Sequence, residues 1–181
     1  TGYNLREPPG YDEHPGVGYN SDGQLLAVGK KLQKGLAKFE DDFEIQAVVE
    51  LPAEGDGTVH FFIGRDVTNA PLKVCSWTGV KEGWRLCVGG GEDVVSITEK
   101  QLVILSYETA PLEGEGGRTG ESGAAKEPSP IKQPGTVFDE KLVRNDMKFD
   151  ESRATVKAQN SFKALVNVAL ERGTVTTFKV K

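Results

Sequence analysis

The sequence predicts a mostly β protein, built as an antiparallel β-sandwich of the jelly-roll type. Apolar and polar residues alternate along several segments, and a period of two is that of a strand with one buried face. The chain also contains 22 Gly and 9 Pro among its 181 residues, which indicates many turns between short strands. One N-terminal helix, an extended N-terminal arm and a long Gly/Glu/Pro-rich loop complete the predicted architecture.

The clearest strand runs from Phe43 to Leu51, where apolar residues alternate with Glu44, Gln46 and Glu50. The segments that follow it are rich in β-branched and aromatic residues and are separated by turn residues. Further strands are therefore expected at 58–64, 72–78, 84–88, 93–98, 101–108, 162–170 and 174–181.

Residues 24–39 are the best helix candidate. Their apolar side chains recur at spacings of three and four, which places them on one face of a helix. These residues are Leu25, Val28, Leu32, Leu36 and Phe39. A helical spacing also fits residues 153–170, but the Thr- and Val-rich segment that follows favours a strand there.

Residues 1–23 are predicted to form an extended arm, because Pro, Gly and Asn are frequent in them. Tyr3, Tyr11 and Tyr19 recur in this arm and are candidates for contacts with a neighbouring subunit. Residues 24–181 are expected to form one domain, interrupted by a low-complexity loop at 110–135.

The two cysteines flank a predicted hairpin. If the hairpin is centred on Lys81, Cys75 lies opposite Cys87, close enough for a cross-strand disulfide. Two buried thiols that act as small core residues are an equally good interpretation.

The same register places Trp77 opposite Arg85, with Trp84 beside them. An aromatic and cationic cluster of this kind can stack on a sugar ring or form a cation–π pair. These three residues are therefore the candidate binding site, and packing of at least one tryptophan in the core is the alternative.

Composition excludes some classes of partner. The net charge is −5 at neutral pH and the pI is near 5.2, which disfavours binding to nucleic acid or to an anionic membrane. No apolar run approaches the ~20 residues that span a bilayer, so membrane insertion is not expected. The chain opens at Thr1 and its single methionine is Met147, which fits a processed, lumenal or extracellular particle component. An artificial start point would explain the same opening.

Few residues suggest catalysis or metal binding. Glu40, Asp42 and Glu44 alternate like the carboxylates of some sandwich-fold glycosidases, although an acidic, solvated junction is the better interpretation. His60 lies within an apolar strand and is expected to be a satisfied or solvent-facing histidine rather than a base or a ligand. His14, in the arm, has acidic neighbours but is not expected to bind metal. No cofactor is predicted.

Three segments resemble successive strands of laminin-G and concanavalin A-like sandwiches. They are Phe43–Leu51, Gly57–Gly64 and Gly83–Val88, within residues 43–98. The resemblance implies a sandwich fold and assigns no site residue.

These observations predict a non-catalytic structural subunit of a larger assembly, such as a viral or phage particle, a tail, a filament or a multi-subunit complex. Its expected partners are protein subunits, most simply copies of itself, contacted through the arm and the loop. A lectin-like module that binds carbohydrate or protein is the alternative, and a glycosidase ranks third.

Overall fold

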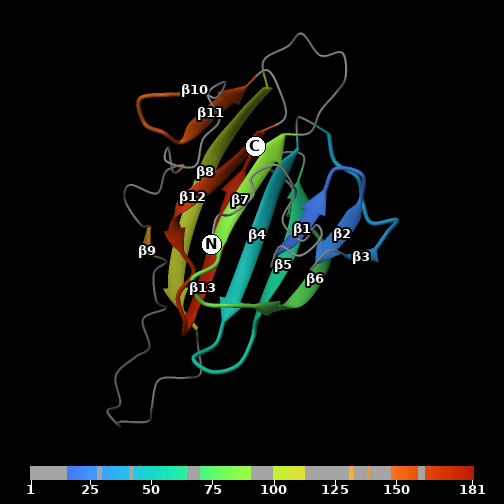
Figure 1. Ribbon diagram of the computed structural model, residues 1–181, viewed down its shortest axis with the longest axis vertical. Coiled ribbons are helices and arrows are strands. Elements are labelled where there is room, and N and C mark those ends of the chain that lie inside the picture. Colours follow the sequence, from blue (N-terminus) through green and yellow to red (C-terminus); the bar gives the residue numbers. More distant parts are fainter. Residues whose placement is uncertain are drawn as a thin grey trace.

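The structure is a computed structural model, and it describes residues 16–27, 30–40, 43–64, 70–90, 100–112, 131–132, 138, 148–158 and 162–181. Strands dominate these residues, the paired strands run antiparallel, and no helix occurs among them (Figure 1). The prediction of a mostly β, antiparallel protein is therefore confirmed. The strand expected at 93–98 lies outside the described residues.

The largest sheet forms one layer of the molecule. Its strands follow the order β10-β11-β8-β13-β4-β5-β6, and β9 pairs with β8 beside this path. Their bounds are Glu44–Leu51 (β4), Gly57–Gly64 (β5), Leu72–Val80 (β6), Lys100–Pro111 (β8), Ile131–Lys132 (β9), Lys148–Phe149 (β10), Thr155–Ala158 (β11) and Thr174–Val180 (β13).

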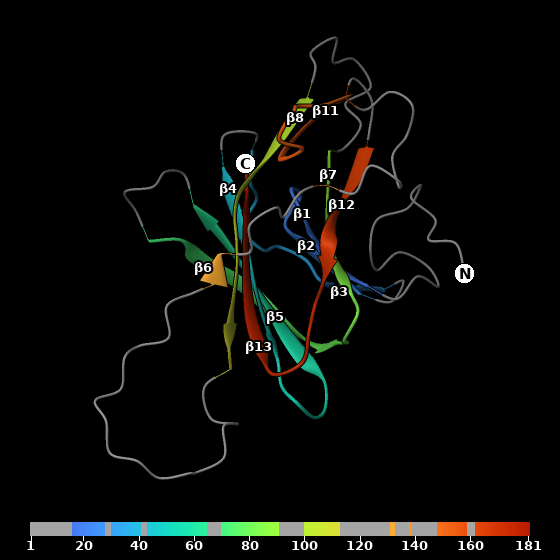
Figure 2. The ribbon, with the colours of Figure 1, turned by 90° about the vertical axis from the view of Figure 1, so that its left-hand side faces the viewer.

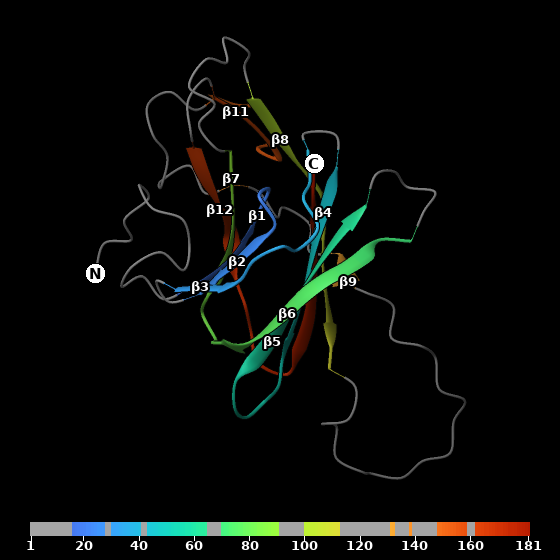
Figure 3. The same cartoon turned by 90° about the vertical axis from the view of Figure 1, so that its right-hand side faces the viewer.

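Two smaller sheets lie against one face of this layer. One is the three-stranded sheet β1-β2-β3, and the other is the pair β12-β7. Seen from either side, these five strands lie on one side of the large sheet (Figures 2 and 3). Their bounds are Val17–Asn20 (β1), Gln24–Ala27 (β2), Lys30–Gln33 (β3), Arg85–Gly90 (β7) and Phe162–Ala169 (β12).

The hydrophobic core fills the space between the two layers. Alternate residues of β4, the buried Ala47, Val49 and Leu51, pack in one cluster with Leu86 of β7. In a second cluster Phe178 of β13 packs with Val166, which belongs to β12. Period-two alternation thus produces one buried face per strand, as the sequence predicts.

The predicted helix at residues 24–39 is wrong. Gln24–Ala27 is β2, which pairs with β1 through a turn in which the Gly23 amide donates to the Asn20 carbonyl at 3.0 Å. Gly23 has φ +74°, a left-handed conformation that ends regular structure easily. The Leu36 amide donates back to the Gly23 carbonyl at 3.0 Å, so the chain after β3 folds against the hairpin.

Two other boundaries differ from the prediction. Residues 155–158 and 162–169 are strands, so the helical alternative for 153–170 is wrong. The predicted loop at 110–135 is shorter at both ends, because β8 extends to Pro111 and β9 pairs with it. Residues 113–130 lie outside the described residues.

The hairpin predicted around Lys81 is also wrong. β6 pairs with β5 in the large sheet, whereas β7 pairs with β12 in the other layer. The turn between them carries the chain from one layer to the other (Figures 2 and 3). Alternation of apolar residues cannot indicate which sheet a strand joins, because strands of both layers share that pattern.

Candidate functional site

The two cysteines belong to different layers. Cys75 lies opposite Phe61 on β5, and Cys87 lies opposite Leu165 on β12. Both are thiols in the structure, so the disulfide that was one of the two interpretations is not formed. The second interpretation, two thiols used as small apolar residues, fits Cys75, which is buried.

The candidate binding residues Trp77, Trp84 and Arg85 do not form the predicted cluster. Trp77 lies opposite Val59 on the core side of the sheet, and its ring stacks on Trp84 with centroids 6.2 Å apart. Both rings pack against the core cluster between the layers. Arg85 lies opposite Ala169 on β12 and donates from Nη2 to the Asn167 carbonyl at 3.0 Å. The tryptophan pair therefore works as part of the core.

Tyr19 packs within its own chain. Its ring contacts Phe39 and Phe61, with centroids 5.5 and 5.9 Å away, and its hydroxyl donates to the Ala37 carbonyl. It lies on β1, so residues 17–23 of the predicted arm form a strand and a turn. The other two predicted contact residues, Tyr3 and Tyr11, lie outside the described residues.

Burial of Cys75 and Tyr19 makes the fold sensitive to alkali. Burial raises the pKa of the Cys75 thiol to about 11. Burial, with the nearby Cys75 as a second cause, raises the pKa of the Tyr19 hydroxyl to about 12. Both groups are neutral when protonated, so their stabilising contribution is complete below about pH 9 and is lost as the pH rises toward 11–12.

We therefore expect the free energy of unfolding, measured in urea, to fall between pH 9 and pH 11. Burial also raises the pKa of the Tyr107 hydroxyl, which adds to the fall. Replacing Cys75 with alanine removes one of these titrations, so it should flatten the fall while lowering stability at pH 8. An equally steep fall in the Cys75→Ala chain would contradict this assignment.

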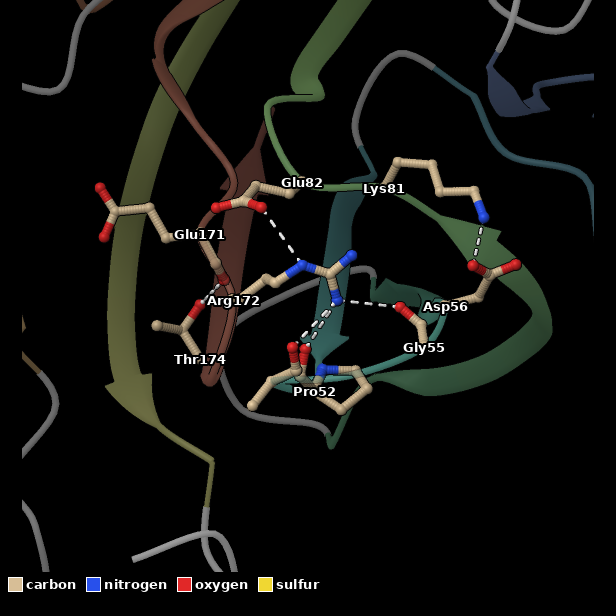
Figure 4. A network of polar contacts seen from close by, with 9 residues as sticks. Pro52, Gly55, Asp56, Lys81, Glu82, Glu171, Arg172 and Thr174 are labelled. Carbon is tan, nitrogen blue, oxygen red and sulfur yellow. Dashed lines mark hydrogen bonds and ion pairs between the residues drawn. The ribbon is translucent and has the colours of Figure 1, made fainter.

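Arg172 holds together three turns at one end of the molecule (Figure 4). Its Nη1 atom donates to the carbonyls of Pro52, Ala53 and Gly55 at 3.3, 3.3 and 3.0 Å. Its Nε atom donates to Glu82 Oε2 at 3.2 Å. Carbonyls that converge in this way form a site for a cation, and the guanidinium is the cation that fills it. We call these five residues the arginine clamp.

The arginine clamp lies where the chain passes between the layers. One passage joins β6 to β7, and the other joins β12 to β13. The two passages bond to each other, since the Gly83 amide donates to the Leu170 carbonyl at 2.9 Å and the Leu170 amide to the Trp84 carbonyl at 2.8 Å. Lys81 and Asp56 form an ion pair beside them (Figure 4). The clamp is therefore a structural device that fixes both passages.

A polar cluster lies on the opposite face of the large sheet, away from the core. His60 alternates with the buried Val59, so its side chain points outward from β5, which lies between β4 and β6. Its Nδ1 atom is 2.7 Å from Ser76 Oγ on β6, and its Nε2 atom is 3.6 Å from Glu50 Oε1 on β4. We call Glu50, His60 and Ser76 the outer-face triad.

The outer-face triad is held in place by the sheet beneath it. Ser76 lies directly opposite His60, and the adjoining pair on the same face, Thr58 and Thr78, joins hydroxyl to hydroxyl at 2.9 Å. Glu50 lies opposite Thr58 and therefore diagonally from His60. The sequence gives no direct sign of this cluster, because its three members are far apart in the chain and meet only through strand register.

The remaining sequence candidates are not brought together. The acidic triplet begins at the exposed Glu40 and ends at Glu44, the first residue of β4, while Asp42 lies outside the described residues. Among the residues described, no group of three or more His, Cys, Asp or Glu side chains is suited to hold a metal ion. Nor does that part of the chain contain a helix with the length and hydropathy needed to cross a bilayer.

Comparison with models of known families, with characterised proteins and with solved structures gives no match for this chain.

Proposed function

We propose that this chain is a non-catalytic structural subunit that assembles with copies of itself through the edge of its large sheet that β6 forms. We also infer that the fold is a β-sandwich, because the layers bury a continuous core between them. The assembly proposal depends on the strand at that edge, β6.

The observation that carries the proposal is the length and composition of β6. It has nine residues, Leu72–Val80, and it ends the order of the large sheet, with β5 as its one neighbour among the described residues. A long edge strand presents unpaired backbone amides and carbonyls that another strand can bond. Leu72, at its start, is 62% exposed, more than Leu32 or Leu105. Figure 3 views the molecule from the side on which β6 lies in front.

Charge supports a second copy as the occupant of this edge. The chain carries 27 Asp and Glu against 22 Lys and Arg, so two copies have the same sign of net charge and repel each other weakly as wholes. β6 contains no acidic residue, and Lys73 is its one charged side chain. A strand that pairs antiparallel with its own copy satisfies a two-fold axis, which is the commonest symmetry of oligomers.

The carbohydrate-binding alternative lacks comparable support. The tryptophans were the residues expected to stack on a sugar ring. In the structure the Trp77 ring packs on Trp84 and against the core instead. Binding of the monomeric chain to an immobilised polysaccharide, lost on Trp84→Ala, would favour that alternative over assembly.

Replacing Leu72 with aspartate should weaken the assembly. The change removes apolar area from the contact and places an acid in each copy at an edge free of acids, so we expect the dissociation constant to rise roughly 10- to 100-fold. Sedimentation equilibrium measures this directly against the 19.6 kDa mass of the single chain.

Leu105→Asp is the matched control, because Leu105 is 45% exposed and lies on β8, which has a neighbour on each side. That variant should assemble like the unchanged chain. If both variants assemble equally well, or if the unchanged chain is a monomer at every concentration, the proposal is wrong.

A further inference from the structure

The outer-face triad has a hydrogen-bond arrangement that a structural role does not require. Among the described residues its imidazole makes one hydrogen bond, the 2.7 Å contact that joins Nδ1 to Ser76 Oγ. The other nitrogen, Nε2, is 3.6 Å from Glu50 Oε1, which is longer than a hydrogen bond. Two groups that can each bind a cation thus face each other across a short gap.

We infer that Glu50 and His60 bind a divalent transition-metal ion of the Zn²⁺ class, with Ser76 as the residue that orients the imidazole. Ser76 belongs to β6, the edge strand proposed above, but metal binding by Glu50 and His60 does not require assembly.

The separation of the two ligand atoms fits such an ion. Zinc binds imidazole nitrogen and carboxylate oxygen at about 2.0–2.2 Å. Two ligand atoms at that distance from one ion and 3.6 Å from each other subtend an angle of about 120°, close to the tetrahedral value. The gap is therefore too long for direct bonding and suitable for a bridging ion.

Ser76 supplies the outer hydrogen bond that metal-binding histidines use. When Nδ1–H donates to Ser76 Oγ, the lone pair of Nε2 is left to face Glu50. A bond of this kind fixes the tautomer and the ring orientation of the ligand. The strands beneath the three residues are neighbours in one sheet, so their side chains are held at a fixed spacing before the ion arrives.

The donor set determines the class of ion. One imidazole and one carboxylate suit Zn²⁺ and its transition-metal neighbours, whereas Mg²⁺ and Ca²⁺ prefer oxygen ligands alone. Two protein ligands leave coordination positions for water or for a group from another molecule. The Glu50 side chain is 48% exposed and that of His60 is 18% exposed, so the ion enters and leaves without opening the fold.

The experiment combines imidazole NMR with zinc titration of the full chain. The chain has two histidines, so a His60→Gln variant assigns both sets of ring signals. We expect His60 to carry its proton on Nδ1 in the absence of metal. Zinc chloride should shift the His60 Nε2 signal and saturate at one ion per chain, and magnesium chloride should not.

The variants separate binding from a structural role. His60→Gln should abolish saturable zinc binding, and Glu50→Gln should weaken it at least tenfold. Ser76→Ala should weaken it by about tenfold, the size of effect expected when the outer hydrogen bond of a ligand is lost. Glu108→Gln, on β8, and His14→Gln serve as controls and should leave affinity unchanged.

Three results would overturn the inference. The first is a zinc affinity that is unchanged in His60→Gln, and the second is a His60 proton on Nε2 that zinc does not displace. The third is zinc binding that is lost in His14→Gln. Circular dichroism of each variant establishes that the sheet is intact, so a loss of binding cannot be attributed to unfolding.

Discussion

Replacing Gly79 with alanine should lower the free energy of unfolding by about 2–5 kcal/mol. Gly79 forms a bulge in β6, because Gly57 pairs with Val80 while Thr58 pairs with Thr78. Its φ is +136°, a conformation that side-chain-bearing residues rarely adopt. An added Cβ would also overlap the Trp77 ring, whose Cζ2 atom would be 2.8 Å away. Strain and overpacking therefore act together.

Urea unfolding and tryptophan fluorescence together measure this effect. The fluorescence should change as well, because Trp77 can relieve the overlap only by moving against Trp84. Gly83→Ala is the matched control, since Gly83 has φ +78° but no atom within 4 Å of an added Cβ. Gly83→Ala should lower the free energy of unfolding by only about 1–2 kcal/mol. Equal losses for the two variants would show that the contact with Trp77 has no energetic role.

Replacing Arg172 with alanine should lower the free energy of unfolding by about 2–3 kcal/mol, because three carbonyls lose their Nη1 donor and the Glu82 carboxylate loses its Nε donor. Solvent reduces the loss, since the turns are partly open to water. Arg172→Lys should restore little of the lost free energy of unfolding, because a single ammonium cannot point its N–H groups in the directions of the planar guanidinium.

Glu82→Gln separates the two halves of the arginine clamp. This change removes the ion pair and keeps the carbonyl contacts, so it should cost less than about 1 kcal/mol at this exposed position. If Glu82→Gln is as damaging as Arg172→Ala in the same urea titration, the ion pair rather than the carbonyl contacts holds the turns.

Strand positions were largely predictable from the sequence, and strand partners were not. Alternation around Ala47 and Val49 identified β4 because one face of that strand is buried. The same alternation in β6 and β7 suggested a hairpin, and five residues with glycine at both ends made the turn plausible. The missing information was the change of layer, which depends on contacts with β12 and on Arg172, both distant in sequence.

The false helix at 24–39 has a similar cause. Its leucines coincide with a helical spacing, but Asn20 and Gly23 bracket a tight turn that starts a hairpin. The Asn20 side chain accepts from the Gln24 amide at 3.0 Å, a local bond that competes with helix initiation. Asn20 and Gly23 are typical turn residues, and glycines at positions 29 and 35 disfavour a helix. Together they indicate a hairpin rather than a helix in this segment.

The outer-face triad could not be predicted from the sequence. The alternation within the strand indicates that the His60 side chain lies on the outer face of the sheet. It does not indicate which side chains of β4 and β6 lie beside it. Register decides which side chains meet across a sheet, and a shift of one residue would have placed Ser76 on the core side.

Amide hydrogen exchange along β6, measured at several protein concentrations, tests the assembly proposal most directly. If two copies pair through this edge, the amides of Leu72–Val80 that point away from β5 should be protected at high concentration and exchange freely on dilution. The amides of β4 and β13, each paired on both sides, should stay protected throughout. Exchange along β6 that is the same at every concentration would contradict assembly through this edge.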